Sequence, residues 1–418
     1  MSSKATPEHA RAAAVAIVRT LRDAGHIAYL AGGCVRDELL GLAPADFDVA
    51  TDATPARLRV IFPRTAEVGE AFGVVLVTVG KSEGLAAAAT VEVATFRADG
   101  PYSDRRRPDV VTFSDALADA RRRDFTINAL FLDPLADEPR RIIDHVGGRD
   151  DLSRRLIRAV GDPEQRLAED HLRALRAVRL AARLSFTIDA ATADAIRRHA
   201  ADLKGVSRER IGDELRRMLA SPTRAAAARL LQSLTLDGPV LGESAADTPI
   251  RVLAGLPADA DYPTSLAAWA IDRGIDRLGL TQTVQRWRRA LCLSNEERTA
   301  LRAALAAHNL LKSGAWTTLP MAGQKRAAVA EGFASGLVLL AADEPAVASG
   351  VRARLAHLEA SIAGLAPAPL LVGDDLIAAG FKPGPAFKTI LDRIYDAQLE
   401  GQLDSKIAAL ELARRLGV

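Results

Sequence analysis

The stretch that decides the fold of the first part of the chain is residues 30–52, which read LAGGCVRDELLGLAPADFDVATD. Its pattern is typical of a strand, a Gly-Gly turn, a helix, a loop and a second strand. Gly32 and Gly33 would let the backbone approach a ligand at the amino end of the helix, where exposed N–H groups favour phosphate. The pair alone is weak evidence, since most such pairs are only turns. It is neither a Walker A loop nor a dinucleotide fingerprint, because the lysine and the third glycine are missing.

Two carboxylates follow in the second half of this stretch. Asp46 and Asp48 are two residues apart on the predicted strand, so both side chains leave the same face, while Phe47 points into the core. The two carboxylates would repel each other unless a divalent cation neutralised them, and Mg²⁺ binds carboxylate and phosphate oxygens. An isolated Asp-x-Asp is more often a pair of solvated acids. After Gly-Gly and Arg36-Asp37, however, the pair indicates a metal site.

The composition excludes several classes of protein. The 418 residues allow two or three domains, and 49% hydrophobic and 26% charged residues exclude a disordered or fibrous chain. Two cysteines are too few for a disulfide scaffold, and no apolar run approaches the roughly 18 residues of a membrane span. The amino terminus lacks an apolar signal core, so we expect a cytoplasmic protein.

Strand and helix signals divide the chain near residue 150. Before that point, Val-rich runs broken by glycine alternate with helical stretches, and Thr54 before Pro55 predicts a helix N-cap. The predicted strands are Ile27–Ala31, Phe47–Ala50, Gly73–Val79 and Thr90–Phe96. After about Asp151 the strand signal disappears, and the predicted helices begin with Pro163–Arg183, Ala190–Leu203, Ser207–Ala220 and Thr223–Leu234. We therefore expect the α+β class, with a mixed α/β head followed by a long all-α portion.

Arginines are locally concentrated although the net charge is only +2. Two triple runs, Arg105–Arg107 and Arg121–Arg123, lie within twenty residues of each other. A solvated face is the ordinary explanation of such a run. Their place beside the residues that suggest catalysis favours phosphate binding instead.

Five motifs across residues 30–215 resemble the class II tRNA nucleotidyltransferase and poly(A) polymerase family, of the polymerase-β nucleotidyltransferase superfamily. The first is the Gly-Gly-x-Val-Arg-Asp run followed by Asp-x-Asp. The others are RRDFTINA at 122–129, DHVGGRDDL at 144–152, EDHLR at 169–173, continuing to Arg179, and SRERIGDEL at 207–215. The resemblance implies a polymerase-β-like nucleotidyltransferase head in residues 1–150. It also implies a helical neck with a nucleotide-base-reading motif in 151–235 and a helical, tRNA-binding body and tail in 236–418.

The function that the resemblance implies is template-independent addition of C and A from CTP and ATP to the 3′ end of tRNA, with Mg²⁺ as cofactor. In two-metal nucleotidyl transfer, Asp46 and Asp48 would be metal ligands. The superfamily also implies a third carboxylate on a neighbouring strand. Glu92 is the candidate, although it could merely pair with an arginine. The nucleotide-binding residues that we predict are Gly32, Gly33, Arg36, Asp37, Arg122, Arg123, Asp124, Asn128, Asp170, Arg173, Arg176 and Arg179.

Asp124 and Asn128 are candidates for contacts with ribose. They are four residues apart, so on a helix they share one face. A carboxylate and an amide together can hydrogen-bond hydroxyl groups that both donate and accept, and the resemblance implies that this motif selects ribose over deoxyribose. Asp124 could instead be only the N-cap of a helix Phe125–Leu132.

Asp170 and Arg173 are candidates for reading the base. On a helical wheel they fall on one face, where they could form an ordinary ion pair. Cytosine and adenine each present an amino donor beside an unprotonated ring nitrogen, which a carboxylate and a guanidinium would match. Uracil and guanine present a carbonyl beside a ring N–H and would be mispaired. The pair can therefore admit CTP and ATP and reject UTP and GTP, with Glu169 orienting its neighbours.

Other activities share part of this pattern. Bacterial poly(A) polymerases and specialised CC-adding or A-adding enzymes carry the same motifs, although residues 68–74 look like the tRNA-type form. A small-molecule nucleotidyltransferase would not need Asp170, Arg173 or the long helical portion, and a non-catalytic RNA-binding protein would not need the two carboxylates. The Phe96–Pro108 segment resembles the family's flexible loop. Arg286, Arg288 and Arg289 around Trp287 form either a phosphate patch or solvated arginines beside a core Trp; neither a protein partner nor a membrane is indicated.

Overall fold

The computed structural model of the chain describes residues 6–67, 73–80, 87–100, 108, 110–138, 140–275, 279–382, 384 and 386–416. The chain divides into two compact units. The amino-terminal unit comprises Met1–Glu214 and Leu230–Val240, and the carboxy-terminal unit comprises Leu215–Arg229 and Leu241–Val418. The functional division into head, neck, and body and tail at residues 150 and 235 is kept as a proposal. The predicted α+β class, a mixed sheet followed by helices, is confirmed.

A mixed seven-stranded sheet, in the order β3-β4-β5-β2-β1-β8-β9, forms the centre of the amino-terminal unit. β2 runs antiparallel to β1 and parallel to β5, so the start of β2 is flanked by both strands. Four of these strands match the predicted ones within one or two residues. The strands are β1 (Ala28–Ala31), β2 (Asp48–Thr51), β3 (Thr65–Glu67), β4 (Val74–Val79), β5 (Ala89–Thr95), β8 (Phe131–Leu132) and β9 (Ile142–Ile143).

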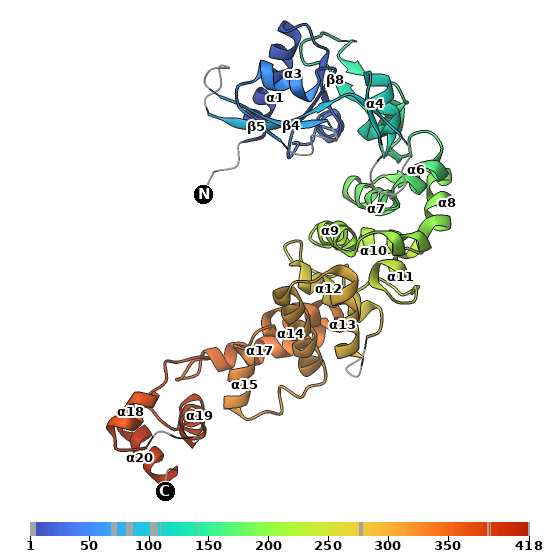
Figure 1. Cartoon of the computed structure of the whole chain (residues 1–418). Helices are drawn as coiled ribbons and strands as arrows, with labels where there is room; N and C mark the ends of the chain where they lie inside the picture. The colour runs from blue at the N-terminus through green and yellow to red at the C-terminus, as the bar shows by residue number, and fades with distance from the viewer. Residues whose placement is uncertain are drawn as a thin grey trace. The chain divides into compact units, whose positions relative to one another are not determined.

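Helix α1 (Pro7–Asp23) packs against β1, β2 and β5 (Figure 1). Its apolar stripe, which includes Ile17 and Leu21, is buried against the sheet. Helix α3 (Pro55–Ile61) begins at the predicted N-cap, because the Thr54 hydroxyl accepts a hydrogen bond from the Arg57 N–H. Removing such a cap costs about 1 kcal/mol.

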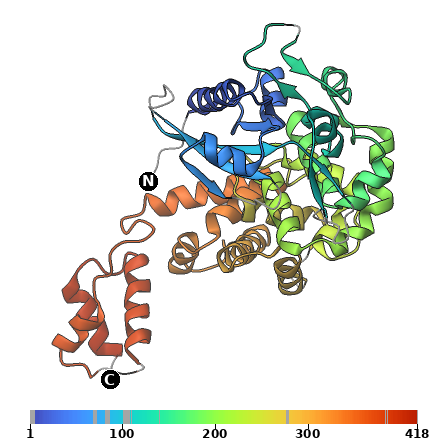
Figure 2. The ribbon, with the colours of Figure 1, turned by 45° about the horizontal axis from the view of Figure 1, so that its top comes forward.

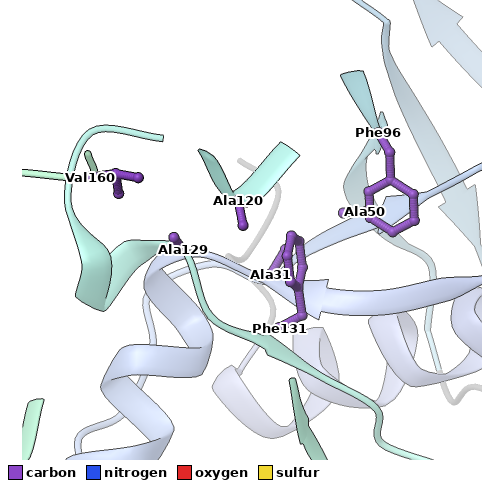
Figure 3. Packing of buried hydrophobic residues seen from close by; sticks show 7 residues of the cluster. All are labelled: Ala31, Ala50, Phe96, Ala120, Ala129, Phe131 and Val160. Carbon is purple, nitrogen blue, oxygen red and sulfur yellow. The ribbon is translucent and has the colours of Figure 1, made fainter. Parts of the chain in front are cut away.

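Aromatic packing supports the middle of the sheet, as Figure 3 shows. The rings of Phe96, after β5, and Phe131, on β8, meet nearly edge to face with centroids 5.8 Å apart. Ala31 and Ala50 belong to the same buried cluster and leave room for the rings. The cluster therefore fixes β1 and β2. Asp48, on which the predicted metal site depends, is the first residue of β2.

Short elements link the sheet to a series of helices in the amino-terminal unit. A parallel pair of two-residue strands, β10 and β11, lies within the part that was predicted to be all helical. The short elements are α2 (Gly33–Leu39), β6 (Arg97–Asp99), β7 (Val111–Phe113), α4 (Ala116–Arg122), η3 (Thr126–Asn128), α5 (Gly148–Ser153), β10 (Leu156–Ile157), β11 (Thr187–Ile188) and η4 (Ala200–Gly205). The helices that follow are α6 (Pro163–Glu169), α7 (Arg173–Leu184), α8 (Ala190–His199), α9 (Arg208–Leu219), α10 (Arg224–Ser233) and α11 (Asp237–Leu241).

Two predicted helices are wrong in detail. The predicted helix Pro163–Arg183 is broken at 170–172 into α6 and α7. Residues 125–132 form the single turn η3 followed by β8 rather than a helix, because Phe131 and Leu132 pair with β1. Most of the predicted flexible loop, including Arg105–Arg107, and residues 68–72 lie outside the described residues.

Helices joined by loops are the regular secondary structure in the described residues of the carboxy-terminal unit. Trp287 is fully buried, and both its Nε1–H and the Arg286 guanidinium donate to Glu243, so this tryptophan is a core residue. The last three helices pack on one another around a small apolar cluster of their own (Figure 2). The helices are α12 (Tyr262–Asp272), α13 (Leu280–Leu291), α14 (Asn295–Lys312), α15 (Met321–Ala328), α16 (Phe333–Asp343), α17 (Pro345–Glu359), α18 (Gly373–Ala378), α19 (Ala386–Leu399) and α20 (Lys406–Leu416). None of the helices in the described ranges is long and apolar enough to span a membrane.

Candidate active site

Asp46, Asp48 and Glu92 are neighbours where β2 and β5 run side by side. Asp48 is the first residue of β2 and pairs in register with Glu92 of β5. Asp46 precedes the strand, so the prediction that both aspartates lie on it is wrong, although Phe47 is buried as expected. Burial first, and then the negative charges of Asp46 and Glu92, raise the pKa of Asp48 to about 6. A bound cation would relieve this repulsion, although the carboxylate oxygens of the three residues do not all lie within 4.8 Å of one another, so their side chains would have to turn before all three could bind one ion.

Gly32 forms the turn between β1 and α2. Its φ of +79° and ψ of −132° lie in a region that is open almost only to glycine. A Cβ atom at this position would lie 3.0 Å from Nη1 of Arg123. The backbone conformation therefore favours glycine here, and a Cβ would also displace the Arg123 guanidinium by a few tenths of an ångström; both Gly32 and Gly33 line the cavity described below.

Arg36 and Asp37 are buried at 4% exposure and belong to an ionic network. Arg36 donates from Nε to Asp37 Oδ1 at 2.8 Å and from Nη1 to Asn128 Oδ1 at 2.6 Å. Arg183 of α7 donates to the other Asp37 oxygen at 2.8 Å. The network connects α2 to η3 and α7. Asp37 accepts hydrogen bonds from both Arg36 and Arg183 and so fixes the orientation of their guanidinium groups.

Asp119 of α4 holds Arg122 and Arg123 side by side. Its Oδ1 accepts from Arg122 Nε and Nη2 at 2.9 and 2.6 Å, and its Oδ2 accepts from Arg123 Nε and Nη2 at 3.1 and 3.0 Å. Burial opposes ionisation of Asp119, but the two guanidinium charges outweigh it and lower the pKa of this carboxyl. The ionised Asp119 therefore orients both arginines.

Asp124 and Asn128 contact each other across the turn η3. Asn128 Nδ2 donates to Asp124 Oδ1 at 3.1 Å, and Arg176 of α7 donates from Nε and Nη2 to Asp124 Oδ2 at 2.8 and 2.6 Å. Burial opposes ionisation of Asp124, but Arg176 and these hydrogen bonds lower its pKa to about 2. The predicted juxtaposition is thus present, but through a 3₁₀ turn instead of an α-helix.

Asp170 is the first residue of the break between α6 and α7, Arg173 is the first residue of α7, and the two side chains pair with other residues. Asp170 Oδ2 accepts from Arg210 Nη2 at 2.6 Å, and Oδ1 accepts from the Leu172 N–H at 3.1 Å. Arg173 Nη1 donates to Glu169 Oε2 at 2.5 Å and to the Arg166 carbonyl at 2.6 Å. The ordinary ion pair between Asp170 and Arg173 is therefore not formed, and Glu169 orients the arginine as predicted.

These residues surround one cavity of about 460 Å³ within the amino-terminal unit. It collects all the predicted site residues except Asp37, Asp46 and Glu92. Arg176 and Arg179 are each held by an acid, Arg179 by Glu214 at 2.6 Å. The described residues that line the cavity are Gly32, Gly33, Arg36, Asp48, Arg122, Arg123, Asp124, Asn128, Asp170, Leu172, Arg173, Arg176, Arg179, Leu180, Arg183 and Arg210.

Two arginines of the cavity were not predicted. Arg183 continues the spacing of Arg173, Arg176 and Arg179 along one face of α7, a periodicity that could have identified it. Arg210 lies in the SRERIGDEL motif and comes from α9, which is distant in sequence from its partner Asp170. The sequence does not indicate that Arg210 and Asp170 are neighbours; the fold brings them together.

Comparison with known proteins first defines the class. A family model described as "Poly A polymerase head domain" matches residues 28–158, and one described as "Probable RNA and SrmB- binding site of polymerase A" matches residues 185–243. Together with the site, these matches define a nucleotidyltransferase of the polymerase-β type. Enzymes of this type use divalent metal ions.

Similarity over the whole chain defines the family. A CCA-adding enzyme of Limosilactobacillus fermentum is 37% identical over 393 residues, which cover 93% of this chain and 92% of the relative. One of Geobacillus stearothermophilus is 36% identical over 405 residues, 94% of each chain. The crystal structure of the Bacillus stearothermophilus CCA-adding enzyme in complex with CTP aligns with a TM-score of 0.76 and 30% identity over 97% of each chain. The chain belongs to the family of CCA-adding enzymes.

Proposed function

We propose that this chain adds C and A nucleotides from CTP and ATP to the 3′ end of tRNA without a template. The observation that carries the proposal is that Asp48, a set of oriented arginines and the two base-reading candidates Asp170 and Arg173 face one cavity. A cavity of about 460 Å³ is in the range that small-molecule ligands occupy. The structurally similar Bacillus enzyme was crystallised with CTP, which supports a nucleoside triphosphate as the ligand.

Asp46, Asp48 and Glu92 would hold the divalent cations, and we propose Mg²⁺ because the donor set consists of carboxylate oxygens. When bound, such ions lower the pKa of the attacking 3′-hydroxyl and neutralise charge on the leaving pyrophosphate. Asp48 has a pKa of about 6, so it is mostly ionised at neutral pH and available as a ligand. The pairing of β2 with β5 keeps Asp48 and Glu92 on adjacent strands.

The triphosphate would lie against the arginines of the cavity wall. Arg122 and Arg123 are held by Asp119, which fixes their planes and leaves other N–H groups for phosphate oxygens. The Gly32–Gly33 turn brings backbone close to the same space. The arginines thus need little rearrangement on binding, which lowers the cost of binding a polyanion.

The ribose would contact Asp124 and Asn128. Arg36 donates a hydrogen bond to the side-chain oxygen Oδ1 of Asn128, and Asp124 accepts one hydrogen of the Asn128 side-chain amide. The two bonds fix this amide in one orientation. The second amide hydrogen of Asn128 can then donate to a ribose hydroxyl, while Asp124, whose two oxygens already accept from Asn128, from the Phe125 N–H and from Arg176, holds the amide in place beside the ribose. Loss of the hydroxyl would leave this amide hydrogen of the buried Asn128 without a partner, which penalises deoxyribose.

The base would be read by Asp170 and Arg173. Within the described part of the chain, the hydrogen bonds of Arg173 use Nη1, so Nε and Nη2 remain available to donate to cytosine N3 or adenine N1. Each Asp170 oxygen accepts one hydrogen bond and has a lone pair left for the amino group of the base. Uracil and guanine would place a ring N–H against the guanidinium, and UTP and GTP are therefore rejected.

Complete CCA addition is favoured over the related activities. Relatives that align over more than nine tenths of this chain are named CCA-adding enzymes, which supports neither poly(A) synthesis nor a CC-only or A-only enzyme. A synthase of small nucleotides would have no use for the helices of the carboxy-terminal unit, to which we assign tRNA binding. We place the reaction in the cytoplasm with the substrate tRNA.

The experiment that tests this function uses tRNA without its 3′-terminal CCA, incubated with each labelled triphosphate separately and with CTP and ATP together. We expect two C residues from CTP alone, and one terminal A only when CTP is also present or the tRNA already ends in CC. Long A tracts would identify a poly(A) polymerase, and arrest after CC or a need for preformed CC would identify a specialist. No incorporation from any triphosphate would refute the proposal.

A further inference from the structure

A second group of metal-ligating side chains lies outside the cavity. His171, His199 and Asp202 each offer one donor atom, and these atoms all lie within 4.8 Å of one another. The three residues come from the break between α6 and α7, the end of α8, and the turn η4. They belong to the same unit, and none of the three lines the nucleotide cavity.

The contacts around His199 give this group a defined geometry. Nδ1 of His199 is 2.8 Å from Asp202 Oδ2, and Nε2 is 2.9 Å from Oε2 of Glu164 on α6. The His171 ring packs beside the His199 ring, with centroids 5.5 Å apart. His171 is buried, whereas the Asp202 side chain is 42% exposed, so an ion could reach the group from solvent.

We propose that His171, His199 and Asp202 form a transition-metal site suited to Zn²⁺. Zn²⁺ bound by histidine nitrogen and carboxylate oxygen at about 2.0–2.2 Å places neighbouring donor atoms roughly 3.4 Å apart. The observed donor atoms, 2.8 to 4.8 Å apart, therefore need only small side-chain adjustments. Two imidazole ligands disfavour Mg²⁺, which keeps this site chemically distinct from the carboxylates Asp46, Asp48 and Glu92.

Glu164 is placed to hold the His199 ring in the orientation that binds the ion, because its carboxylate lies 2.9 Å from His199 Nε2. If the His199 Nε2–H donates to Glu164, the Nδ1 lone pair is left to bind the ion, an arrangement that orients most zinc-bound histidines. Arg198 also binds Glu164, which keeps that carboxylate in place. Three protein ligands leave a fourth position for water.

The site would fasten the segment that follows Asp170. His171 is adjacent to Asp170 in sequence, while Asp202 lies on η4 after α8. A bound ion would thus cross-link the break between α6 and α7 to the far end of α8 and stabilise the amino-terminal unit. The inference does not depend on the proposed function, because binding of the metal is measured directly.

The competing explanation of the same contacts is a His199 that only hydrogen-bonds to the two carboxylates, without any metal. Titration of the full-length, metal-free protein with ZnCl2 by calorimetry distinguishes the two, with excess Mg²⁺ present to occupy the catalytic carboxylates. We expect one Zn²⁺ per chain, a melting temperature raised by Zn²⁺, and a tetrahedral d–d spectrum with Co²⁺. His199→Gln and Asp202→Asn should weaken binding by at least about tenfold, and Glu164→Gln by about tenfold.

Two control variants test specificity. His357→Ala and Cys292→Ser, both at exposed positions, should bind Zn²⁺ as tightly as the wild type. Because His171 is buried, His171→Ala can fail to fold, and His199→Gln and Asp202→Asn decide the question at more exposed residues. The inference is overturned if the wild type shows no saturable Zn²⁺ binding, or if both of these variants bind as tightly as the wild type.

Discussion

Replacing Arg173 directly tests the proposed recognition of the nucleotide base. Arg173 is 9% exposed at the first position of α7, with Nη1 held by Glu169 and by the Arg166 carbonyl. Arg173→Ala leaves cytosine N3 and adenine N1 without a donor. It also leaves Asp170 in place, held by Arg210, to accept a hydrogen bond from the ring N–H of uracil or guanine.

The expected loss is one of selectivity. A good bidentate contact to a base contributes about 1–3 kcal/mol of discrimination, so the ratio of kcat/KM for CTP to that for UTP should fall roughly tenfold to a hundredfold. The assay measures kcat/KM for all four triphosphates on tRNA that ends before CCA. Affinity for the divalent metal should change little, because Asp46, Asp48 and Glu92 are not contacted by Arg173.

A conservative variant distinguishes recognition of the base by Arg173 from its structural role in the ion pair with Glu169. Arg173→Lys keeps a charge for Glu169 but lacks the planar fork of N–H groups, so it should restore stability without restoring selectivity. Arg197→Ala, which breaks a more exposed arginine–carboxylate pair with Asp194 on α8, away from the cavity, should leave the ratio unchanged. If Arg173→Ala slows all four triphosphates equally and keeps the CTP to UTP ratio, or if lysine restores full selectivity, the arginine is only structural.

Other variants test the remaining parts of the cavity. Asp46→Ala and Asp48→Ala should each abolish incorporation of labelled CTP while circular dichroism and tRNA affinity stay unchanged, because each removes a metal ligand; near-normal incorporation in either would refute its role. Gly32→Ala should raise KM for CTP far more than Gly25→Ala, since φ is +79° and +83° but only at Gly32 would a Cβ meet a neighbour, at 3.0 Å; equal KM values would contradict this. Asp124→Asn should lower the free energy of unfolding of the amino-terminal unit by about 2 kcal/mol at pH 7, because the fold lowers the pKa of Asp124 from 3.8 to about 2. The ionised carboxylate stabilises the fold above pH 4, and this contribution is lost as the pH falls toward 2, so urea denaturation should show the gap closing over that range; a gap independent of pH would exclude the ion pair as its cause.

The elements that could be predicted are those with a strong local signal. β4 and β5 alternate buried and more exposed positions, and α3 begins with a capping threonine and a proline. Twelve of the fifteen predicted site residues line one cavity, and the roles that we assign to them there stay predictions. β8 and β9 have only two residues each, too few for a periodicity, and they depend on pairing with β1 and with each other.

The break between α6 and α7 could not be predicted because the helical pattern continues through it. The residues from Asp170 to Leu172 carry no proline or glycine, and Leu172 continues the apolar face. Tertiary contacts override this local preference: Asp170 accepts from Arg210 of α9 and from the Leu172 N–H, and both bonds fix it outside a helix. The same break places Asp170 and Arg173 at the cavity without pairing them to each other.

The acids around the cavity keep its arginines ready for a polyanion. Eight arginines and three aspartates are among the described residues that line it, so the wall carries a clear excess of positive charge. Acids that lie outside the lining set hold several of these guanidinium groups from behind, namely Asp37, Asp119, Glu169 and Glu214. Asp37 and Asp119 each hold two of these arginines, and Glu169 and Glu214 hold one each, while the excess of arginine over aspartate in the lining keeps the wall positive. Stabilisation of this kind costs no reorganisation during the reaction. In the proposed reaction, a triphosphate that brings several negative charges into the cavity would therefore meet guanidinium groups held by these acids, and more of the binding energy would remain for discriminating between bases.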